Sequence, residues 1–115
     1  MNPSVRTIIY PVRDVGKANA LFSAHLGVQP DADQPYYVGF RVGEQDVGLD
    51  PNGHKNGMTM PVDYYQVEDM QKALQALLAA GAQVHQEAKD VGGGRLIAIV
   101  KDADGNLIGL LQDPK

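Results

Sequence analysis

The sequence predicts an α+β fold built from two copies of one βαβββ unit, and two observations support this prediction. The segment 10–27 resembles the segment 65–81, and four residues match at an offset of 55 positions. Each copy is followed by two or three strand-like runs, and a strand-helix start followed by hairpins places the helix on one face of a sheet. The matching residues are Tyr10, Val12, Asp14 and Lys17 in the first copy and Tyr65, Val67, Asp69 and Lys72 in the second.

Each copy contains one predicted amphipathic helix. Asp14 and Asp69 are good N-caps, because a carboxylate accepts the free N–H groups of the first helical turn. Gly27 and Gly81 are expected to end the helices in the left-handed conformation. Apolar residues recur between them at helical spacing, namely Ala18, Leu21, Phe22 and Leu26 in the first helix and Met70, Ala73, Leu74, Leu77 and Leu78 in the second.

The remaining strands follow each helix. The first copy predicts strands over 36–42 and 46–50, and the second predicts a short edge strand over 82–87 and a hairpin of 95–100 with 106–111. The stretch PNGHKNGMTMP is rich in turn formers and is typical of a linker. We therefore expect one domain over 1–115, with module 1 at about 1–52, the linker at about 51–61 and module 2 at about 62–115.

Composition limits the possible functions. Of 115 residues, 43% are hydrophobic and 21% are charged, as in an ordinary soluble globular protein. The absence of cysteine excludes disulfides, thiolate nucleophiles and cysteine metal sites. No membrane-length apolar run or secretory signal is seen, so a cytoplasmic location is expected. A net charge of -4 with scattered basic residues argues against nucleic acid as a partner.

The closing stretch KDADGNLIGLLQ, together with the two strand-to-aspartate entries, resembles the vicinal oxygen chelate superfamily. This superfamily includes glyoxalase I, bleomycin-resistance proteins and extradiol dioxygenases. Its closing hairpin usually has a proline where this chain has Ala103. The resemblance covers essentially the whole chain. It implies two modules whose strands form a half-open, curled mixed sheet around a cavity, and it implies a homodimer.

The resemblance also implies where a metal would be held in metal-using members. In each module one ligand stands seven residues before the N-cap aspartate, and a second stands in the last strand. In this chain the four positions are Thr7, Val62, Gly48 and Gly109. None supplies the imidazole or carboxylate that divalent metals need, so we predict no metal and no cofactor. Asp63 is one residue out of step and is expected to face the helix.

Two interpretations of Gly48 and Gly109 remain open at this stage. Glycine inside a strand marks a bulge, a twist or a close approach by another group. In the first interpretation both glycines open space for a ligand. In the second they only permit twist or close packing of the sheet.

Other candidate chemistry in the sequence is weak. His25, His54 and His85 are not expected to converge on one point and are interpreted as surface residues. Ser4 and Ser23 lack a nucleophile-elbow motif. The run VGGGRL lacks the lysine and helix of a phosphate loop, so it predicts a glycine-rich entry to a strand. Arg95 would then lie near one end of the cavity as an anion contact, or be simply exposed.

Strand alternation gives a candidate ligand-binding lining. An inward Thr7 and an inward Val62 imply a mostly apolar cup with few polar groups, although the same side chains could fill a closed core. The predicted site residues are Thr7, Ile9, Tyr37, Gly48, Asp50, Val62, Tyr64, Arg95, Ala98 and Gly109. Gln66, Leu96, Val100 and Leu111 are expected on the same side.

These patterns favour a protein that binds a small, partly apolar molecule without a metal, and the drug-sequestering bleomycin-resistance proteins are the nearest functional model. The alternative is a lyase, isomerase or dioxygenase-like enzyme with an unconventional site such as Tyr37, Asp50 and Tyr64. A structural or regulatory protein with a filled core is the third possibility. The sequence leaves the catalytic residues unknown.

Overall fold

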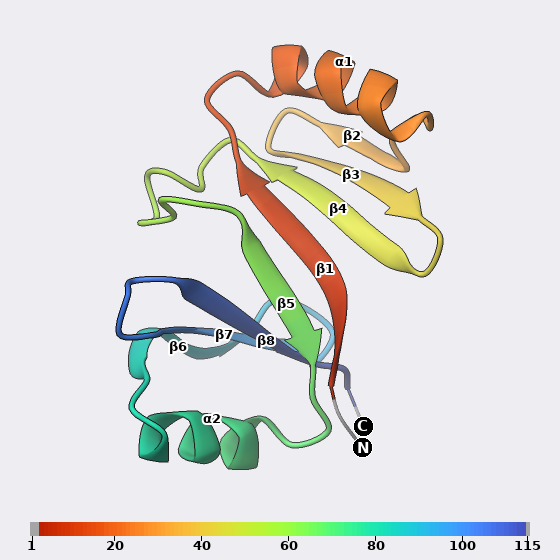
Figure 1. The fold of residues 1–115 in the computed structure, drawn as a ribbon. Helices are drawn as coiled ribbons and strands as arrows, with labels where there is room; N and C mark the ends of the chain where they lie inside the picture. The colour runs from red at the N-terminus through yellow and green to blue at the C-terminus, as the bar shows by residue number, and fades with distance from the viewer. Residues whose placement is uncertain (1–2, 115) are drawn as a thin grey trace. The chain divides into compact units, whose positions relative to one another are not determined.

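The computed structural model describes residues 3–114. Its contacts divide the chain into two compact units. The first unit comprises residues 7–62, and the second comprises residues 3–6 together with 63–114. Each unit contains one helix and a set of strands paired in both directions (Figure 1), which confirms the predicted α+β class.

The first unit is built on four strands. They are β1 (Ser4–Pro11), which enters the unit at residue 7, β2 (Ala32–Gln34), β3 (Tyr37–Val42) and β4 (Gln45–Asp50), in the order β2-β3-β4-β1. β1 is parallel to β4, whereas the other pairs are antiparallel. The sequence missed β2, because three residues are too short to show an alternating pattern.

Helix α1 (Val15–Leu26) covers one face of this unit (Figure 1). The Asp14 carboxylate accepts the Lys17 N–H at 3.0 Å, and Gly27 ends the helix with φ 73°, so both predicted caps are confirmed. Leu21, one of the apolar residues at helical spacing, does not join the core, since its side chain is 64% exposed. The core consists of Val38, Phe40, Val47 and Leu49, packed against Tyr10, Val12, Val15, Ala18, Phe22, Leu26 and Val42.

The second unit repeats this layout. Its strands are β5 (Val62–Gln66), which enters the unit at residue 63, β6 (Gln83–Asp90), β7 (Leu96–Lys101) and β8 (Leu107–Gln112), in the order β5-β8-β7-β6. β5 is parallel to β8, and the hairpin strands are antiparallel. β6 extends three residues beyond the predicted strand, and its pairing with β7 contains two register shifts.

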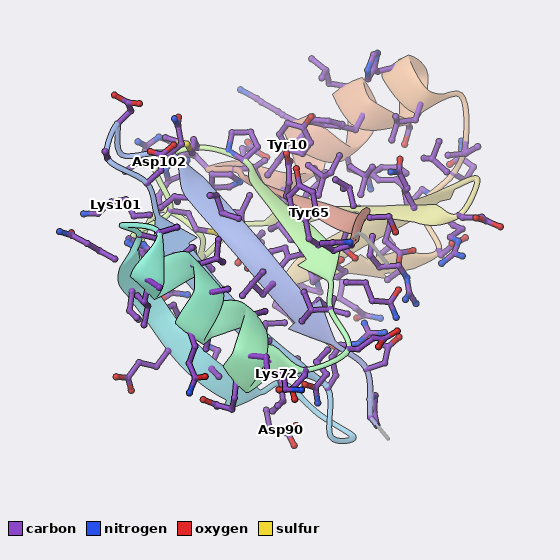
Figure 2. The ribbon with its side chains drawn as sticks, turned by 60° about the horizontal axis from the view of Figure 1, so that its bottom comes forward. Tyr10, Tyr65, Lys72, Asp90, Lys101 and Asp102 are labelled. Atoms are coloured by element: carbon purple, nitrogen blue, oxygen red, sulfur yellow. The ribbon has the colours of Figure 1, made fainter. Side chains whose placement is uncertain are left out.

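Helix α2 (Met70–Ala79) lies across the strands of its own unit (Figure 2). The Asp69 carboxylate accepts the Lys72 N–H at 3.1 Å, and Gln112 Oε1 accepts the Met70 N–H at 2.7 Å. Gly81 has the positive φ expected of it, although Ala80 is the capping residue. The core consists of Met70, Ala98 and Leu110, packed against Val67, Ala73, Leu74, Leu77, Ala88 and Leu96.

No helix between residues 3 and 114 has the length and apolar character needed to cross a membrane.

Candidate functional site

The candidate site residues are sought on one face of the strands in each unit. This face points away from the helix of that unit, and we call it the helix-distal face. Side chains alternate along a strand, so residues next to the core positions of the first unit lie on its helix-distal face. One row crosses β1, β4, β3 and β2 there, because each member is the register partner of the next. The row consists of Ile9, Gly48, Gly39 and Ala32.

The ring of Tyr37 lies over the two glycines of this row. A Cβ on Gly39 would stand 2.9 Å from Cε2 of Tyr37. A Cβ on Gly48 would collide with Oη of Tyr37 and stand 2.7 Å from Cδ1 of Ile9. The space above Gly48 is therefore occupied by side chains of its own unit. This finding corrects the interpretation of Gly48 as an open ligand space.

Two other predicted residues of the first unit have defined surroundings. Thr7 is buried, and it is paired with Asp46 on β4. Asp50 follows Gly48 by two residues and so shares its face, but its carboxylate accepts the Asn52 N–H at 2.8 Å. That bond is the Asx-turn typical of an aspartate at the end of a strand. Asp50 thus stabilises the turn after β4.

A corresponding row crosses the second unit. Tyr64, Gly109, Ile99 and Gln86 are successive register partners on β5, β8, β7 and β6. They alternate with Ala98 and Leu110, which pack against α2, so this row is on the helix-distal face. Tyr64, Ile99 and Gly109 are buried, and Gly109 stands between the other two. Val62, at the start of β5, is also buried.

The predicted orientation of Ala98, Leu96 and Val100 was wrong. Ala98 and Leu96 pack with α2, and Val100 shares their face by alternation. The run from 96 to 100 is apolar throughout, so alternation could not show which residues faced the helix.

The turn at 102–106 sets the register by pairing Lys101 with Leu107 and Ile99 with Gly109. Ile97 and Ile99 therefore face away from α2, while Leu111 does so as predicted.

A polar cluster that the sequence did not predict lies at one end of the second unit. Asp113 accepts hydrogen bonds from Arg6 at 3.2 Å, from Gln66 at 2.7 Å and from Arg95 at 3.0 Å. Arg6 also donates to Oε1 of Gln66 at 3.0 Å. The predicted anion contact of Arg95 is thus an internal carboxylate. A recess of about 400 Å³ lies beside the cluster and is lined by Pro3, Ser4, Gln66, Val67, Glu68, Gln112 and Asp113.

Opposing effects act on the acidity of Asp113. Partial burial raises the pKa of its carboxyl, because burial disfavours the charged form. The hydrogen bond and charge of Arg6, followed by those of Arg95, outweigh burial and hold the pKa below its usual value. The carboxylate is therefore ionised at neutral pH and is held by two guanidinium groups.

The positions expected to bind a metal do not fit one. Thr7, Gly48, Val62 and Gly109 supply no imidazole or carboxylate. Within residues 3–114, no three histidine, aspartate or glutamate side chains come together as a possible metal group. His25, His54 and His85 are exposed, as predicted, and His25 contacts the ring of Phe22.

Comparison with known proteins identifies the family. Residues 4–110 match the model of the glyoxalase/bleomycin resistance protein/dioxygenase superfamily, and the chain belongs to that superfamily. No curated protein matches the chain. The identification therefore rests on the family model, and solved structures show the shared fold.

Three solved structures illustrate the likeness in fold. A superfamily member from Vibrio splendidus 12B01 is 19% identical, has a TM-score of 0.72, and the match covers 97% of this chain and 100% of that one. Methylmalonyl-CoA epimerase from Mycobacterium tuberculosis is 18% identical at TM-score 0.66, over 96% and 87% of the two chains. The Mn(II)-bound glyoxalase from Novosphingobium aromaticivorans is 20% identical at TM-score 0.66, over 97% and 40%. The fold is thus that of the glyoxalase and bleomycin-resistance proteins.

Proposed function

We propose that this chain binds a small, partly apolar molecule without a metal, on the helix-distal face of its strands. One observation carries the proposal: the four positions at which the family resemblance places metal ligands contain threonine, valine and two glycines. Metal-assisted chemistry needs several protein donors, and these residues provide none. What such a face offers instead is apolar surface with a few polar groups, which is how small-molecule sites are usually built.

On this face, we propose the row through Gly109 as the ligand-binding position. Tyr64 and Ile99 flank Gly109, so the row combines an aromatic ring and an aliphatic side chain with a position that has no side chain of its own. The corresponding glycine of the first unit, Gly48, is covered by Tyr37. A structure of Streptomyces coelicolor methylmalonyl-CoA epimerase in complex with 2-nitronate-propionyl-CoA supports the proposal that the family fold accommodates small molecules.

Substitution of Gly109 tests the proposal. A thermal-shift screen of small aromatic and drug-like compounds first identifies a compound that raises the melting temperature of the wild type. Gly109→Leu is then expected to weaken that compound's binding at least about tenfold while the protein stays folded. Ile108→Leu, one position along on the opposite face, is the matched control and is expected to bind normally.

The packed-core interpretation gives the opposite result. Overfilling a tight core costs about 1–3 kcal/mol of folding free energy. If Gly109→Leu loses that much stability and no compound stabilises the wild type, the ligand proposal is wrong. The proposal also includes a homodimer in the cytoplasm with no nucleic acid or membrane partner. The enzyme alternative loses support from Asp50, whose carboxylate is engaged in the turn after β4.

A further inference from the structure

One side-chain amide on the helix-distal face of the second unit is buried without a hydrogen-bond partner. Nε2 of Gln86 is shielded from solvent, and no group in the described part of the chain accepts a hydrogen bond from it. It is the one such atom found among residues 3–114. Buried polar groups are almost always paired, so an unpaired amide needs a physical explanation.

The position of Gln86 links this amide to the proposed ligand surface. Gln86 pairs with Ile99, which in turn pairs with Gly109, so all three lie in one row on the helix-distal face. The β6–β7 pairing shifts register on both sides of Gln86, between it and Val84 and between it and Lys89. Such irregularities re-aim a side chain next to functional sites.

The residues beside Gln86 in this row cannot accept a hydrogen bond through their side chains. Ile99 is 2% exposed and offers only hydrocarbon, while Gly109 offers no side chain. The protein itself covers this primary amide without satisfying it, so an acceptor on a ligand has to displace a covering side chain to reach it. Leaving it unpaired costs free energy, whereas an acceptor oxygen on the ligand would remove that cost.

We infer that Nε2 of Gln86 donates a hydrogen bond to a carbonyl-type oxygen of the bound molecule, so that the ligand class is an apolar body carrying such an acceptor. The inference rests on the proposed function. A site with a buried donor discriminates strongly against an analogue that lacks the acceptor, because that analogue leaves the donor unpaired. Gln86 would therefore determine specificity, while the row through Gly109 would supply contact area.

Matched pairs of probes test this inference. Acetophenone is paired with α-methylstyrene, and cyclohexanone with methylenecyclohexane, so that each ketone has a hydrocarbon of the same planar shape. Dissociation constants are measured by NMR titration of the full chain. The wild type is expected to prefer each ketone about tenfold over its hydrocarbon, the ratio that about one buried hydrogen bond provides.

Two variants isolate the amide. Gln86→Leu is expected to lose the preference while its affinity for the hydrocarbons stays within about twofold, since the apolar contacts remain. Gln83→Leu, at an exposed position of the same strand, is the control and should retain the wild-type preference. Gln86→Glu keeps the side-chain shape but offers a carboxylate acceptor, so it too should lose the preference.

The outcomes separate this inference from the proposed function. Equal binding of ketone and hydrocarbon by the wild type overturns the role of Gln86 but leaves small-molecule binding in place. A preference retained in Gln86→Glu also overturns it, and this variant serves if Gln86→Leu fails to fold. If none of the four probes binds the wild type, the proposed function and the inference fall together. In the wild type, ketone but not hydrocarbon should shift the side-chain amide resonance of Gln86.

Discussion

Position 48 is a glycine because the ring of a neighbouring residue, Tyr37, occupies the space that a side chain would need. Tyr37 starts on β3 and reaches across Gly39 to Gly48 on β4. An aromatic ring that covers strand glycines shields the backbone that they expose. The sequence indicated that a glycine here needs an explanation. It did not show which group fills the space, because that depends on the strand register.

The contact between Tyr37 and position 48 predicts strong coupling between substitutions there. Gly48→Ala should lower the free energy of unfolding by about 1–3 kcal/mol, since the new methyl group displaces the ring. In a Tyr37→Ala background the same change should cost much less. Urea unfolding of the two single variants and the double variant measures the coupling. Costs that add within about 0.5 kcal/mol would contradict the packing described for this ring.

At the scale of elements, the sequence predicted the parts that have local signals. Both N-cap aspartates, the Gly27 cap and the strand–helix order were confirmed because each depends on neighbours in sequence. The faces of β7 could not be predicted, because that strand is apolar at every position before Lys101. The polar cluster could not be predicted either, since Arg6 and Asp113 are 107 positions apart.

The Asp113 cluster ties the beginning of β1 to the ends of β5 and β8 and to the start of β7. The folded-state pKa of Asp113 lies below its usual value, so its ion pairs contribute stability at pH values above about 4 and lose it as the pH falls further. The partners are only partly buried, with 34% of the Asp113 side chain exposed. We therefore expect a contribution of about 1 kcal/mol, below that of a buried pair.

Asp113→Asn tests this contribution. The variant should be less stable than the wild type at pH 7, and the difference should shrink as the pH falls below about 4, where the wild-type carboxylate becomes protonated. Urea midpoints measured from pH 7 to pH 3 give the comparison. Asp104→Asn, at an exposed position in the β7–β8 turn, is the control. A difference that stays constant over this range would contradict the ionic role of Asp113.

At the scale of the whole molecule, the repeated pattern of the sequence was sufficient for the fold. A resemblance at the level of the superfamily did not define a ligand, because one fold carries many sites. The proposed metal independence has a direct test. Zinc, nickel and manganese are expected to leave the melting temperature unchanged, because only a metal that binds the native state raises it.

Elemental analysis of the purified protein should likewise find no stoichiometric metal. Metal-dependent turnover of the methylglyoxal–glutathione adduct is expected to be absent, since stabilising the enediolate depends on a metal acting as Lewis acid. A tightly bound metal, or such turnover, would overturn the proposal. Manganese is the most informative of the three ions, because a solved relative is a Mn(II)-bound glyoxalase.

The chain is expected to form a homodimer. The outermost strands are β2 and β6, and Val84 on β6 is 44% exposed beside its unpaired edge. Such edges favour association with a second chain. Light scattering at micromolar concentration is expected to give twice the 12.4 kDa chain mass. Val84→Lys should shift the mass toward the monomer, and Val28→Lys, after α1, is the control. A wild type that is only monomeric contradicts the dimer.

The ring of Tyr37 also restricts the routes by which this chain could change during evolution. A glutamate or histidine at position 48 would need the volume that the ring and Ile9 now hold. Acquiring a ligand there is therefore not a single-step change, because Tyr37 must be replaced first or at the same time. Homologues that keep Tyr37 are expected to keep glycine at positions 39 and 48. Across homologues, these three positions should vary together as one inherited set.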